Sequence, residues 1–332
     1  SACLVGSEMC IRDSLGARRR NRRDAMIPVD LPLIYAPEIA DAKARGLPIV
    51  ALESTIITHG MPYPENVEAA RAVEAEVRAA GAVPATIALL DGMIHIGLTE
   101  AELEALGHAD DVMKVSRADF AACLAQRRTG ATTVAATMIA AHMADIAVFA
   151  TGGIGGVHRG AETSFDISAD LKELARTPVT VVAAGAKAIL DLPKTLEVLE
   201  TEGVPVITFG QDDFPAFWSR SSGLPSPLRM DTAEEIAAAH AMRTGLGLGG
   251  GQLIANPVPA EYEIPREEMI PAIEQALTEA EAQRIAAKEV TPFLLSRIFD
   301  LTEGRSLATN IQLVLSNARL AAAISRALSP QG

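Results

Sequence analysis

Cysteine is nearly absent from this chain of 332 residues. Three cysteines occur in all, and two of them, Cys3 and Cys10, fall within the first 25 residues. Cys123 is the only cysteine in the rest of the chain, so a disulfide framework inside the fold is excluded. This cysteine usage suits a reducing compartment, and we expect a cytoplasmic protein.

Positive charge and long hydrophobic runs are lacking as well. The chain has 29 Lys and Arg against 42 Asp and Glu, a formal net charge of -13. Binding to a nucleic-acid polymer requires clustered basic residues that neutralise phosphates, so we expect no such partner. The apolar runs, such as Val179–Ala184, fall far short of the roughly 20 residues of a membrane span. We therefore expect a soluble protein with no membrane partner.

Several nucleotide and metal motifs are missing. The chain contains no Gly-Lys dipeptide, which excludes a Walker A phosphate loop. The glycine-rich run Thr151–Gly160 reads G-x-G-x-x-H from Gly153, so it lacks the third glycine of the dinucleotide fingerprint. The six histidines form neither H-x-H nor H-E-x-x-H, and with one cysteine outside the N-terminal stretch they do not support a zinc site.

The first 25 residues differ in composition from the rest. They hold six arginines and three acidic residues, and the string CLVGSEMCIRDS looks like a translated adapter sequence. A transit peptide or a basic arm would be rich in arginine too. We expect residues 1–25 to be a basic extension, disordered or not native to the domain. Residues 26–332 are then expected to form a single domain that begins at Met26.

From about Leu47 onward, short apolar runs alternate with segments of helical periodicity. The predicted strands are Pro48–Glu53, Ala85–Leu90, Val112–Val115, Ile146–Ala150, Val179–Ala184 and Val204–Phe209. The predicted helices are Pro64–Ala80, Thr132–Ala144, Lys194–Thr201, Thr232–Arg243, Arg266–Lys288 and Ser306–Leu328. This alternation predicts an α/β domain with one sheet and helices on both faces. Asp213–Arg229, which contains Trp218, is expected to be a long loop of the kind that often forms a lid or binds a ligand.

Two charged residues near the carboxyl ends of predicted apolar strands are candidates for catalysis. Glu53 ends the first predicted strand, where a partly desolvated carboxyl can act as general acid or base. A helix-capping or ion-paired glutamate is the alternative. Lys187 comes shortly after the apolar run Val179–Ala184. Desolvation favours a neutral amine that can attack a carbonyl, whereas an ordinary lysine there would reach solvent or bind phosphate.

Glycines and paired carboxylates suggest two binding features. The run Thr151–Gly160 allows backbone N–H groups to approach an anion, and His158 lies within it; a simple strand-to-helix turn is the alternative. The second run, Gly245–Gln252, could equally be a backbone crossing. Asp166 and Asp170 would share one face if their segment is helical, which suits Mg²⁺ or Mn²⁺. Alternatively, Asp170 could cap the helix that follows.

Several long motifs occur together and in order. They are VALESTIITHGMP at 50–62, GATTV at 130–134, TGGIGGVHRG at 151–160, FDISAD at 165–170, AGAK at 184–187 and the segment Ala308–Leu320. From Met26 to Leu328 the chain closely resembles the pseudouridine-5'-phosphate glycosidase family, also called the indigoidine-synthase-A-like family. The resemblance implies a three-layer α/β/α sandwich with a mainly parallel or mixed central sheet, usually assembled as a homotrimer. It also implies Mn²⁺ as cofactor and reversible cleavage of pseudouridine 5'-phosphate to uracil and ribose 5-phosphate.

The resemblance assigns roles motif by motif. Glu53 matches the proton donor, Lys187 the nucleophile and Asp166 the metal ligand. The positions that match substrate-binding residues are Lys114, Thr133, Val134, Ser168, Ala169 and Asp170. His158 and Asn310 fall in motifs that line the family's site.

The chemistry of a C–C glycosidic bond agrees with these assignments. Such a bond has no heteroatom leaving group, so hydrolysis by two carboxylates fits poorly. Lys187 could instead form an imine at C1' of the ring-opened sugar, while Glu53 moves protons to the sugar oxygen and the uracil carbon. A Schiff-base phosphosugar aldolase or lyase is the alternative enzyme. A non-catalytic phosphosugar-binding protein, in which Lys114 and Lys187 only neutralise phosphate, is the alternative of another class.

Overall fold

A computed structural model describes residues 31–285 and 290–329 of the chain. The strands are β1 (Leu33–Tyr35), β2 (Ile49–Leu52), β3 (Val83–Leu90), β4 (Met93–Ile96), β5 (Met113–Val115), β6 (Gly130–Thr132), β7 (Val148–Ala150), β8 (Thr180–Ala183), β9 (Val206–Phe209), β10 (Leu228–Met230) and β11 (Gln252–Ala255). They form an 11-stranded sheet in the order β1-β4-β3-β2-β7-β8-β11-β9-β10, and β6 joins β3 to β5. The basic extension predicted for residues 1–25 lies outside the described residues.

The centre of the sheet is parallel. Strands β2, β7, β8, β11 and β9 all run the same way, and most of their residues are apolar and buried. Burial on both faces explains why these segments read as continuous apolar runs rather than alternating ones. The long strand β3 changes the pattern, because its first half pairs with β2 in parallel and its second half pairs with β4 and β6 antiparallel. The sheet is therefore mixed, with a parallel core.

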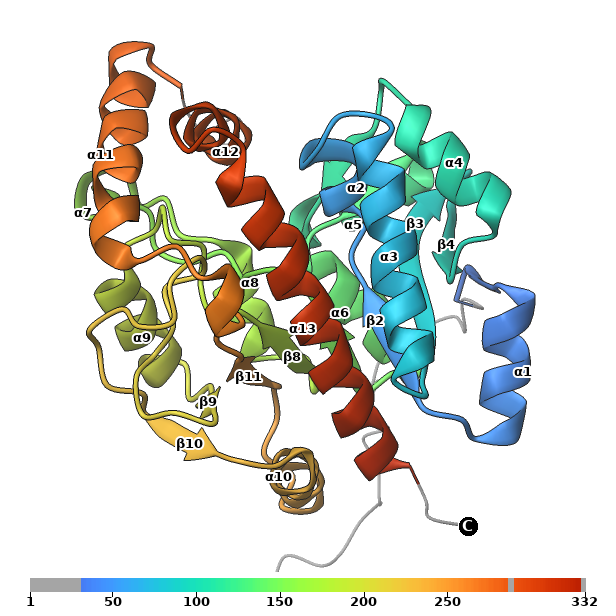
Figure 1. The fold of residues 1–332 in the computed structure, drawn as a ribbon. Helices are drawn as coiled ribbons and strands as arrows, with labels where there is room; N and C mark the ends of the chain where they lie inside the picture. The colour runs from blue at the N-terminus through green and yellow to red at the C-terminus, as the bar shows by residue number, and fades with distance from the viewer. Residues whose placement is uncertain (1–30, 286–289, 330–332) are drawn as a thin grey trace, which may run out of the picture. The chain divides into compact units, whose positions relative to one another are not determined.

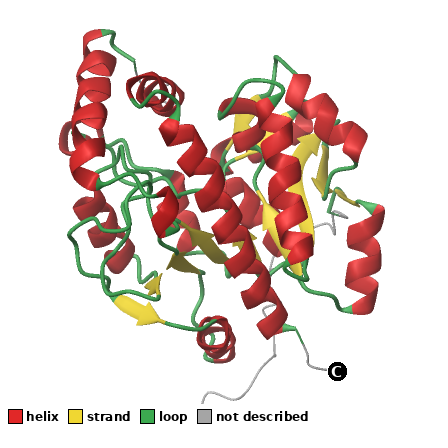
Figure 2. Cartoon of the chain, viewed as in Figure 1, coloured by secondary structure: helices red, strands yellow, loops and turns green. Residues whose placement is uncertain are grey.

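Helices cover both faces of this sheet (Figure 1, Figure 2). They are α1 (Pro37–Arg45), α2 (Thr55–His59), α3 (Glu65–Ala79), α4 (Glu100–His108), α5 (Arg117–Ala125), α6 (Val134–Met143), α7 (Ala161–Ser164), α8 (Ala169–Leu174), α9 (Leu192–Thr201), α10 (Ala233–Gly245), α11 (Arg266–Ala282), α12 (Val290–Leu301) and α13 (Arg305–Leu328). The long helix α13 crosses the front of β2, β7 and β8, with α3 and α10 beside it. Helix α6 packs on the other face of the sheet, against β2 and β7.

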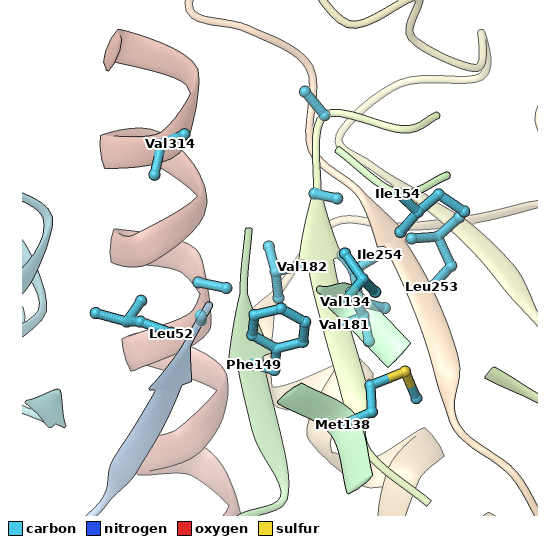
Figure 3. Packing of buried hydrophobic residues seen from close by; sticks show 14 of the residues in the cluster. Leu52, Val134, Met138, Phe149, Ile154, Val181, Val182, Leu253, Ile254 and Val314 are labelled. Carbon is cyan, nitrogen blue, oxygen red and sulfur yellow. The ribbon is translucent and has the colours of Figure 1, made fainter. Parts of the chain in front are cut away.

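The core lies between these layers. Val314 projects from α13 and Met138 from α6, with Phe149 of β7 between them (Figure 3). All three side chains are at most 5% exposed. The prediction of a three-layer α/β/α sandwich with a mainly parallel or mixed sheet is therefore confirmed.

The parallel strands end at one common edge, which we call the carboxyl edge. Glu53 follows β2, Thr151 follows β7 and Asn256 follows β11, so residues far apart in the sequence become neighbours there. Open α/β sheets usually bind their ligands at this edge, where the loops leave the strands. The position of Glu53 after β2 agrees with the prediction.

The structure corrects several predicted elements. The run Gly245–Gln252 ends α10 and leads into β11, a central strand between β8 and β9 that was not predicted. A Cβ at Gly251 would lie 2.1 Å from the carbonyl oxygen of Val179, so glycine allows a close backbone crossing here. The predicted helix Arg266–Lys288 ends at Ala282 as α11, and its last three residues lie outside the described part.

The long loop Asp213–Arg229 packs against the body of the fold, and its Phe217 lines a cavity. Its Trp218 is only 1% exposed, and the indole N–H donates a hydrogen bond to the carbonyl of Ser306 at 3.1 Å. The loop is thus fastened to the start of α13, and its last two residues belong to β10. Among the helices of the described ranges, none is both long and apolar enough to cross a bilayer.

Candidate active site

A cavity of about 430 Å³ opens at the carboxyl edge. It contains every residue to which the sequence analysis gave a site role. These residues are Glu53, Lys114, Thr133, Val134, His158, Asp166, Ser168, Ala169, Asp170, Lys187 and Asn310. They come from six separate stretches of the chain, which the fold brings around one space.

Glu53 is held at both carboxylate oxygens. The hydroxyl of Thr151, after β7, donates to Oε1, and the hydroxyl of Thr55, in the first turn of α2, donates to Oε2. The neighbouring Ser54 is fully buried, and its Oγ accepts the backbone N–H of Thr132 at 2.8 Å. The alternative of an ion-paired glutamate finds no support, because within the described residues Glu53 has no basic partner within salt-bridge distance.

Lys187 lies four residues beyond β8, on a backbone that turns at Gly185. Gly185 has a φ of 84°, in the left-handed region that glycine tolerates best. The turn then pairs with the glycine-rich loop, where the Lys187 N–H donates to the Ile154 carbonyl at 3.1 Å. The side chain is half-buried in the cavity wall, and its Nζ makes no hydrogen bond or ion pair with any residue of the described ranges. It is thus available to a ligand.

Asp170 fastens two parts of the site together. Its carboxylate accepts the N–H of Ala135, in the first turn of α6, at 2.9 Å and the N–H of Gly155 at 2.8 Å. A Cβ at Gly155 would lie 2.8 Å from the Asp170 carboxylate, so this approach requires glycine. Both carboxylate oxygens are therefore occupied by backbone amides.

The structure corrects the predicted geometry of Asp166 and Asp170. Helix α8 begins only at Ala169, and its N-cap is Ser168, whose Oγ accepts the Asp170 N–H at 3.2 Å. The two carboxylates therefore do not share a helix face, and Asp170 is not the cap. The prediction failed because Asp166 is instead in an extended segment, where its carbonyl accepts the His158 N–H at 3.0 Å.

The start of α6 offers one unoccupied donor. The N-cap Thr133 accepts the Ala136 N–H, and Asp170 takes the N–H of Ala135. The N–H of Val134 has no hydrogen-bond acceptor among the residues that the structure describes. A helix N-terminus with an open N–H beside Lys114 favours an anionic group.

Two histidines share the cavity with the two lysines. Burial lowers the pKa of His158, and the ammonium groups of Lys187 and Lys114 lower it further, against the raising effect of Asp166. Burial and Lys114 likewise lower the pKa of His59, whose Nδ1 lies 2.6 Å from the Thr58 hydroxyl. Both imidazoles are therefore weaker bases than a free histidine side chain.

The donor set around Asp166 decides which metal could bind. Among the described residues, no three His, Cys, Asp or Glu side chains gather closely enough to hold an ion. An all-protein zinc site does not fit such a set. A hard divalent ion that takes one carboxylate and keeps water or substrate oxygens as its other ligands does fit, and Mn²⁺ and Mg²⁺ are such ions.

The remaining wall is largely apolar, and one of its polar atoms has no hydrogen-bond partner within the part of the chain that the structure describes. The side chains come from α2, α12, α13 and the loop after β9, and include Ile56, Leu295, Leu307, Ile311, Val314 and Phe217. Asn310 of α13 stands among them, and its Oδ1 is buried with no hydrogen-bond partner. Buried polar atoms are seldom left unpaired, so this oxygen is suited to accept a hydrogen bond from a ligand.

Sequence analysis missed Thr55, His59 and Thr151, which also take part in this site. Thr151 could have been found by one rule, since the first residues after neighbouring parallel strands meet at one edge. Glu53 and Thr151 are such a pair. His59 gave no signal, because a single histidine in a helical pattern has no distinctive spacing.

Known proteins are similar to this chain along most of its length. The family described as Indigoidine synthase A like protein matches residues 38–327. A pseudouridine-5'-phosphate glycosidase of Jannaschia sp. (strain CCS1) is 71% identical over 299 residues, which cover 90% of this chain and 99% of that protein. A protein of the same name from Paracoccus denitrificans (strain Pd 1222) is 71% identical over 301 residues, with the same two coverages of 90% and 99%.

Two solved structures share the fold. The prealnumycin C-glycosynthase AlnA, in complex with ribulose 5-phosphate, has a TM-score of 0.83 at 38% identity and covers 91% of this chain and 98% of its own. An indigoidine synthase A-like protein of Thermotoga maritima has a TM-score of 0.81 at 35% identity, with coverages of 89% and 96%. One of these relatives thus binds a five-carbon sugar phosphate.

Proposed function

The chain belongs to the indigoidine synthase A-like family, and we propose that it cleaves the C–C glycosidic bond of pseudouridine 5'-phosphate to uracil and ribose 5-phosphate. The observation that carries this proposal is the 71% identity, over 99% of their length, to proteins named for that activity. The cavity supports it, because a nucleophilic amine, a proton-transfer group and an anion site meet there.

The phosphate is proposed to bind between Lys114 and the start of α6. Lys114 supplies positive charge, the Val134 N–H is open, and the Thr133 hydroxyl is close by in the same wall. Ser168 and Ala169 line the neighbouring wall, and Asp170 acts indirectly by fixing Gly155 and the first turn of α6. This placement directs the sugar toward Lys187.

Lys187 is proposed to carry the covalent chemistry. Its Nζ bonds to C1' of the sugar as the C1'–O4' bond breaks, and O4' takes a proton from Glu53. Nζ then gives one proton to the Glu53 carboxylate, and its lone pair forms a C1'=N bond as the C1'–C5 bond breaks. The electron pair left on uracil C5 takes up that proton from Glu53. Water hydrolyses the imine, which releases ribose 5-phosphate and restores the amine. The net reaction consumes one water, and it is reversible.

Asp166 is proposed to hold one Mn²⁺ with water and substrate oxygens as its other ligands. The ion supplies positive charge that orients and stabilises oxygen atoms of the substrate. The backbone N–H of His158 donates to the Asp166 carbonyl, and burial lowers the pKa of its imidazole. In its neutral form the ring can donate one hydrogen bond and accept another in this part of the cavity.

The uracil ring is proposed to occupy the apolar side of the cavity. Leu295, Leu307 and Ile311 provide a wall that suits a flat ring, and the unpaired Oδ1 of Asn310 can accept an N–H of uracil. An Asn310→Ala variant should therefore bind ribose 5-phosphate normally and lose affinity for uracil.

We further propose that the protein is a homotrimer, because it resembles this family. We also propose that it is cytoplasmic, because the chain has few cysteines. Light scattering coupled to size exclusion measures the mass in solution. A species of one or two chains would contradict the trimer.

Uracil release tests the proposed activity. The protein is incubated with pseudouridine 5'-phosphate and Mn²⁺, or with EDTA, and uracil is followed chromatographically. We expect metal-dependent uracil. An aldolase would instead release a small aldehyde or ketone. A binding protein would release nothing and, on treatment with borohydride and ribose 5-phosphate, would give no reduced adduct at Lys187.

A further inference from the structure

A line of buried polar side chains crosses the carboxyl edge from β11 to β2 and ends at Glu53. Asn256, Asn317 and Thr151 form this line, with exposed fractions of 6%, 0% and 2%. We propose that Thr151 and Asn317 are positioning residues, which hold the Glu53 carboxylate in one orientation for proton transfer. The inference rests on the proposed function, because that function gives Glu53 a proton to move.

The first step is the contact between Thr151 and Glu53. The last torsion of a glutamate side chain has broad minima, so a carboxylate without partners samples many orientations. Here Thr151 donates to Oε1 and Thr55 donates to Oε2. Because the two hydroxyls come from different segments, they select one carboxylate plane and leave the other lone pairs to the substrate.

The second step is the contact between Thr151 and Asn317. The Nδ2 of Asn317 donates to the Thr151 carbonyl at 2.8 Å, and its Oδ1 accepts the Nδ2 of Asn256 at 2.9 Å. The Thr151 N–H donates to Val182 of β8 at 3.0 Å. Thr151 is thus fixed at its amide and its carbonyl, which leaves the hydroxyl as the group that reaches Glu53.

This line also spans the strand that leads to Lys187. Asn317 joins the end of β7 to the end of β11, and β8 lies between them. The segment that leaves β8 carries Lys187. A shift of Asn317 would therefore move Glu53 relative to Lys187, and misplacing a catalytic group by about 1 Å can cost about 100-fold in rate.

A purely structural role is the alternative, and α13 provides a matched control for it. Ser325 fastens the other end of the helix to the sheet, since its hydroxyl donates to the Ile49 carbonyl at 2.9 Å. Ser325 is 6% exposed, and Ile49 begins β2, far from the cavity. If Asn317 merely attached α13 to the sheet, loss of either contact would have the same effect on turnover.

The test compares variants of the whole chain. Thr151→Val keeps the shape and removes the hydroxyl; we expect kcat to fall about 10- to 100-fold while KM for pseudouridine 5'-phosphate stays within about twofold. Thr151→Ser restores the hydroxyl and should recover most of kcat. Asn317→Ala should lower both kcat and Tm, and adding it to Thr151→Val should lower kcat no further. Ser325→Ala should lower Tm and leave kcat unchanged.

Two outcomes would overturn the inference while the wild type still releases uracil. One is a folded Thr151→Val variant with the wild-type kcat. The other is a Ser325→Ala variant that loses as much kcat as Asn317→Ala, which would assign these contacts to folding alone. If the wild type itself releases no uracil, the proposed function fails first, and the role of Thr151 falls with it.

Discussion

Polar side chains form similar hydrogen bonds at both ends of the parallel strands, but their surroundings differ. At the carboxyl edge, two hydroxyl groups donate to Glu53 beside a cavity. At the opposite end, which we call the amino edge, Gln252 donates to the Thr180 hydroxyl at 3.1 Å and Ser325 donates to Ile49. The partners at the amino edge are protein groups inside the core. Polar contacts at the amino edge join one protein group to another, whereas those at the carboxyl edge orient a side chain that lines a cavity.

A pair of histidines shows why burial alone does not mark a site. His158 at the carboxyl edge and His240 near the amino edge are both half-buried, and burial is the main cause that lowers the pKa of each. Asp166, Lys187 and Lys114 also act on the pKa of His158, from three segments, whereas Arg243 alone acts with burial on that of His240. The convergence of charges around a cavity is what distinguishes a candidate site.

The largest difference between the two edges is expected when Lys187 is replaced. Lys187→Ala should reduce uracil release at least about 1,000-fold, because it removes the proposed covalent nucleophile and the other amine of the cavity, Lys114, is proposed to bind the phosphate. Its Tm should stay within about 3 °C of the wild type, since a half-buried side chain without internal partners adds little stability. Borohydride with ribose 5-phosphate should give a reduced adduct at Lys187, detected by mass spectrometry. Lys172→Ala, on the exposed side of α8, is the control; full activity of Lys187→Ala would exclude the imine.

The next effect is expected at Glu53. Glu53→Gln keeps the shape, but only one threonine hydroxyl can still donate to the amide oxygen, and the other must accept from the amide N–H. The amide cannot give up or take a proton, so kcat should fall about 100- to 10,000-fold. Binding of ribose 5-phosphate, measured by calorimetry, should change by less than about threefold, because the phosphate site is elsewhere in the cavity. A loss of binding as large as the loss of kcat would show that Glu53 binds the substrate instead.

Asp166 should give an intermediate effect that depends on the metal. Asp166→Asn removes the one carboxylate available to the ion, so a higher Mn²⁺ concentration, by at least about tenfold, should be needed for half-maximal activity. Activity is measured across a Mn²⁺ titration after treatment with EDTA. The exposed Asp110→Asn serves as control. An unchanged titration would place the ion elsewhere.

The smallest effect is predicted at the amino edge and concerns stability alone. Because burial lowers the pKa of His240 in the fold, the unfolded chain takes up its proton first as the pH falls. This contribution is complete above about pH 6.5 and is lost below it. The free energy of unfolding, measured in urea from pH 7.5 to 5.5, should therefore fall less steeply in His240→Asn than in the wild type. Glu74, whose pKa is raised by burial, changes the free energy of unfolding in the opposite direction. This effect is the same in both proteins, so it cancels when the two slopes are compared. Equal slopes would contradict the prediction, and kcat at pH 7.5 should not change.

Sequence reasoning worked best where the chain is both apolar and regular. Strands β7 and β8 are buried and mostly apolar. Residues that follow parallel strands lie at the carboxyl edge of the sheet, and Glu53 and Lys187 are two of them. Strand β11 was missed because only four residues, preceded by glycines, signal it. Its central place comes from pairing with β8 and β9, which no local pattern reveals.

The candidate site divides in the same way. Glu53 and Lys187 could be proposed from chemistry and position, and Asp166, Asp170 and His158 from local patterns. The remaining site residues came from the family resemblance. Asp166 and Asp170 were misplaced because spacing alone cannot tell a helix from the extended segment that precedes α8. Asn317 could not be found, since an asparagine on the periodic face of a long helix becomes informative only when its two partners are known.

Helix α13 also has a consequence for the order in which the protein is made. Its hydrogen bond from Ser325 to Ile49 joins residues 276 positions apart, and that from Asn317 to Thr151 joins residues 166 apart. The helix that covers the front of the first central strand is therefore synthesised after every strand of the sheet. Contacts so distant in sequence form slowly, and the apolar face of β2 and β7 stays uncovered until then. We expect nascent chains that stop before residue 305 to depend on chaperones and to be cut readily by proteases.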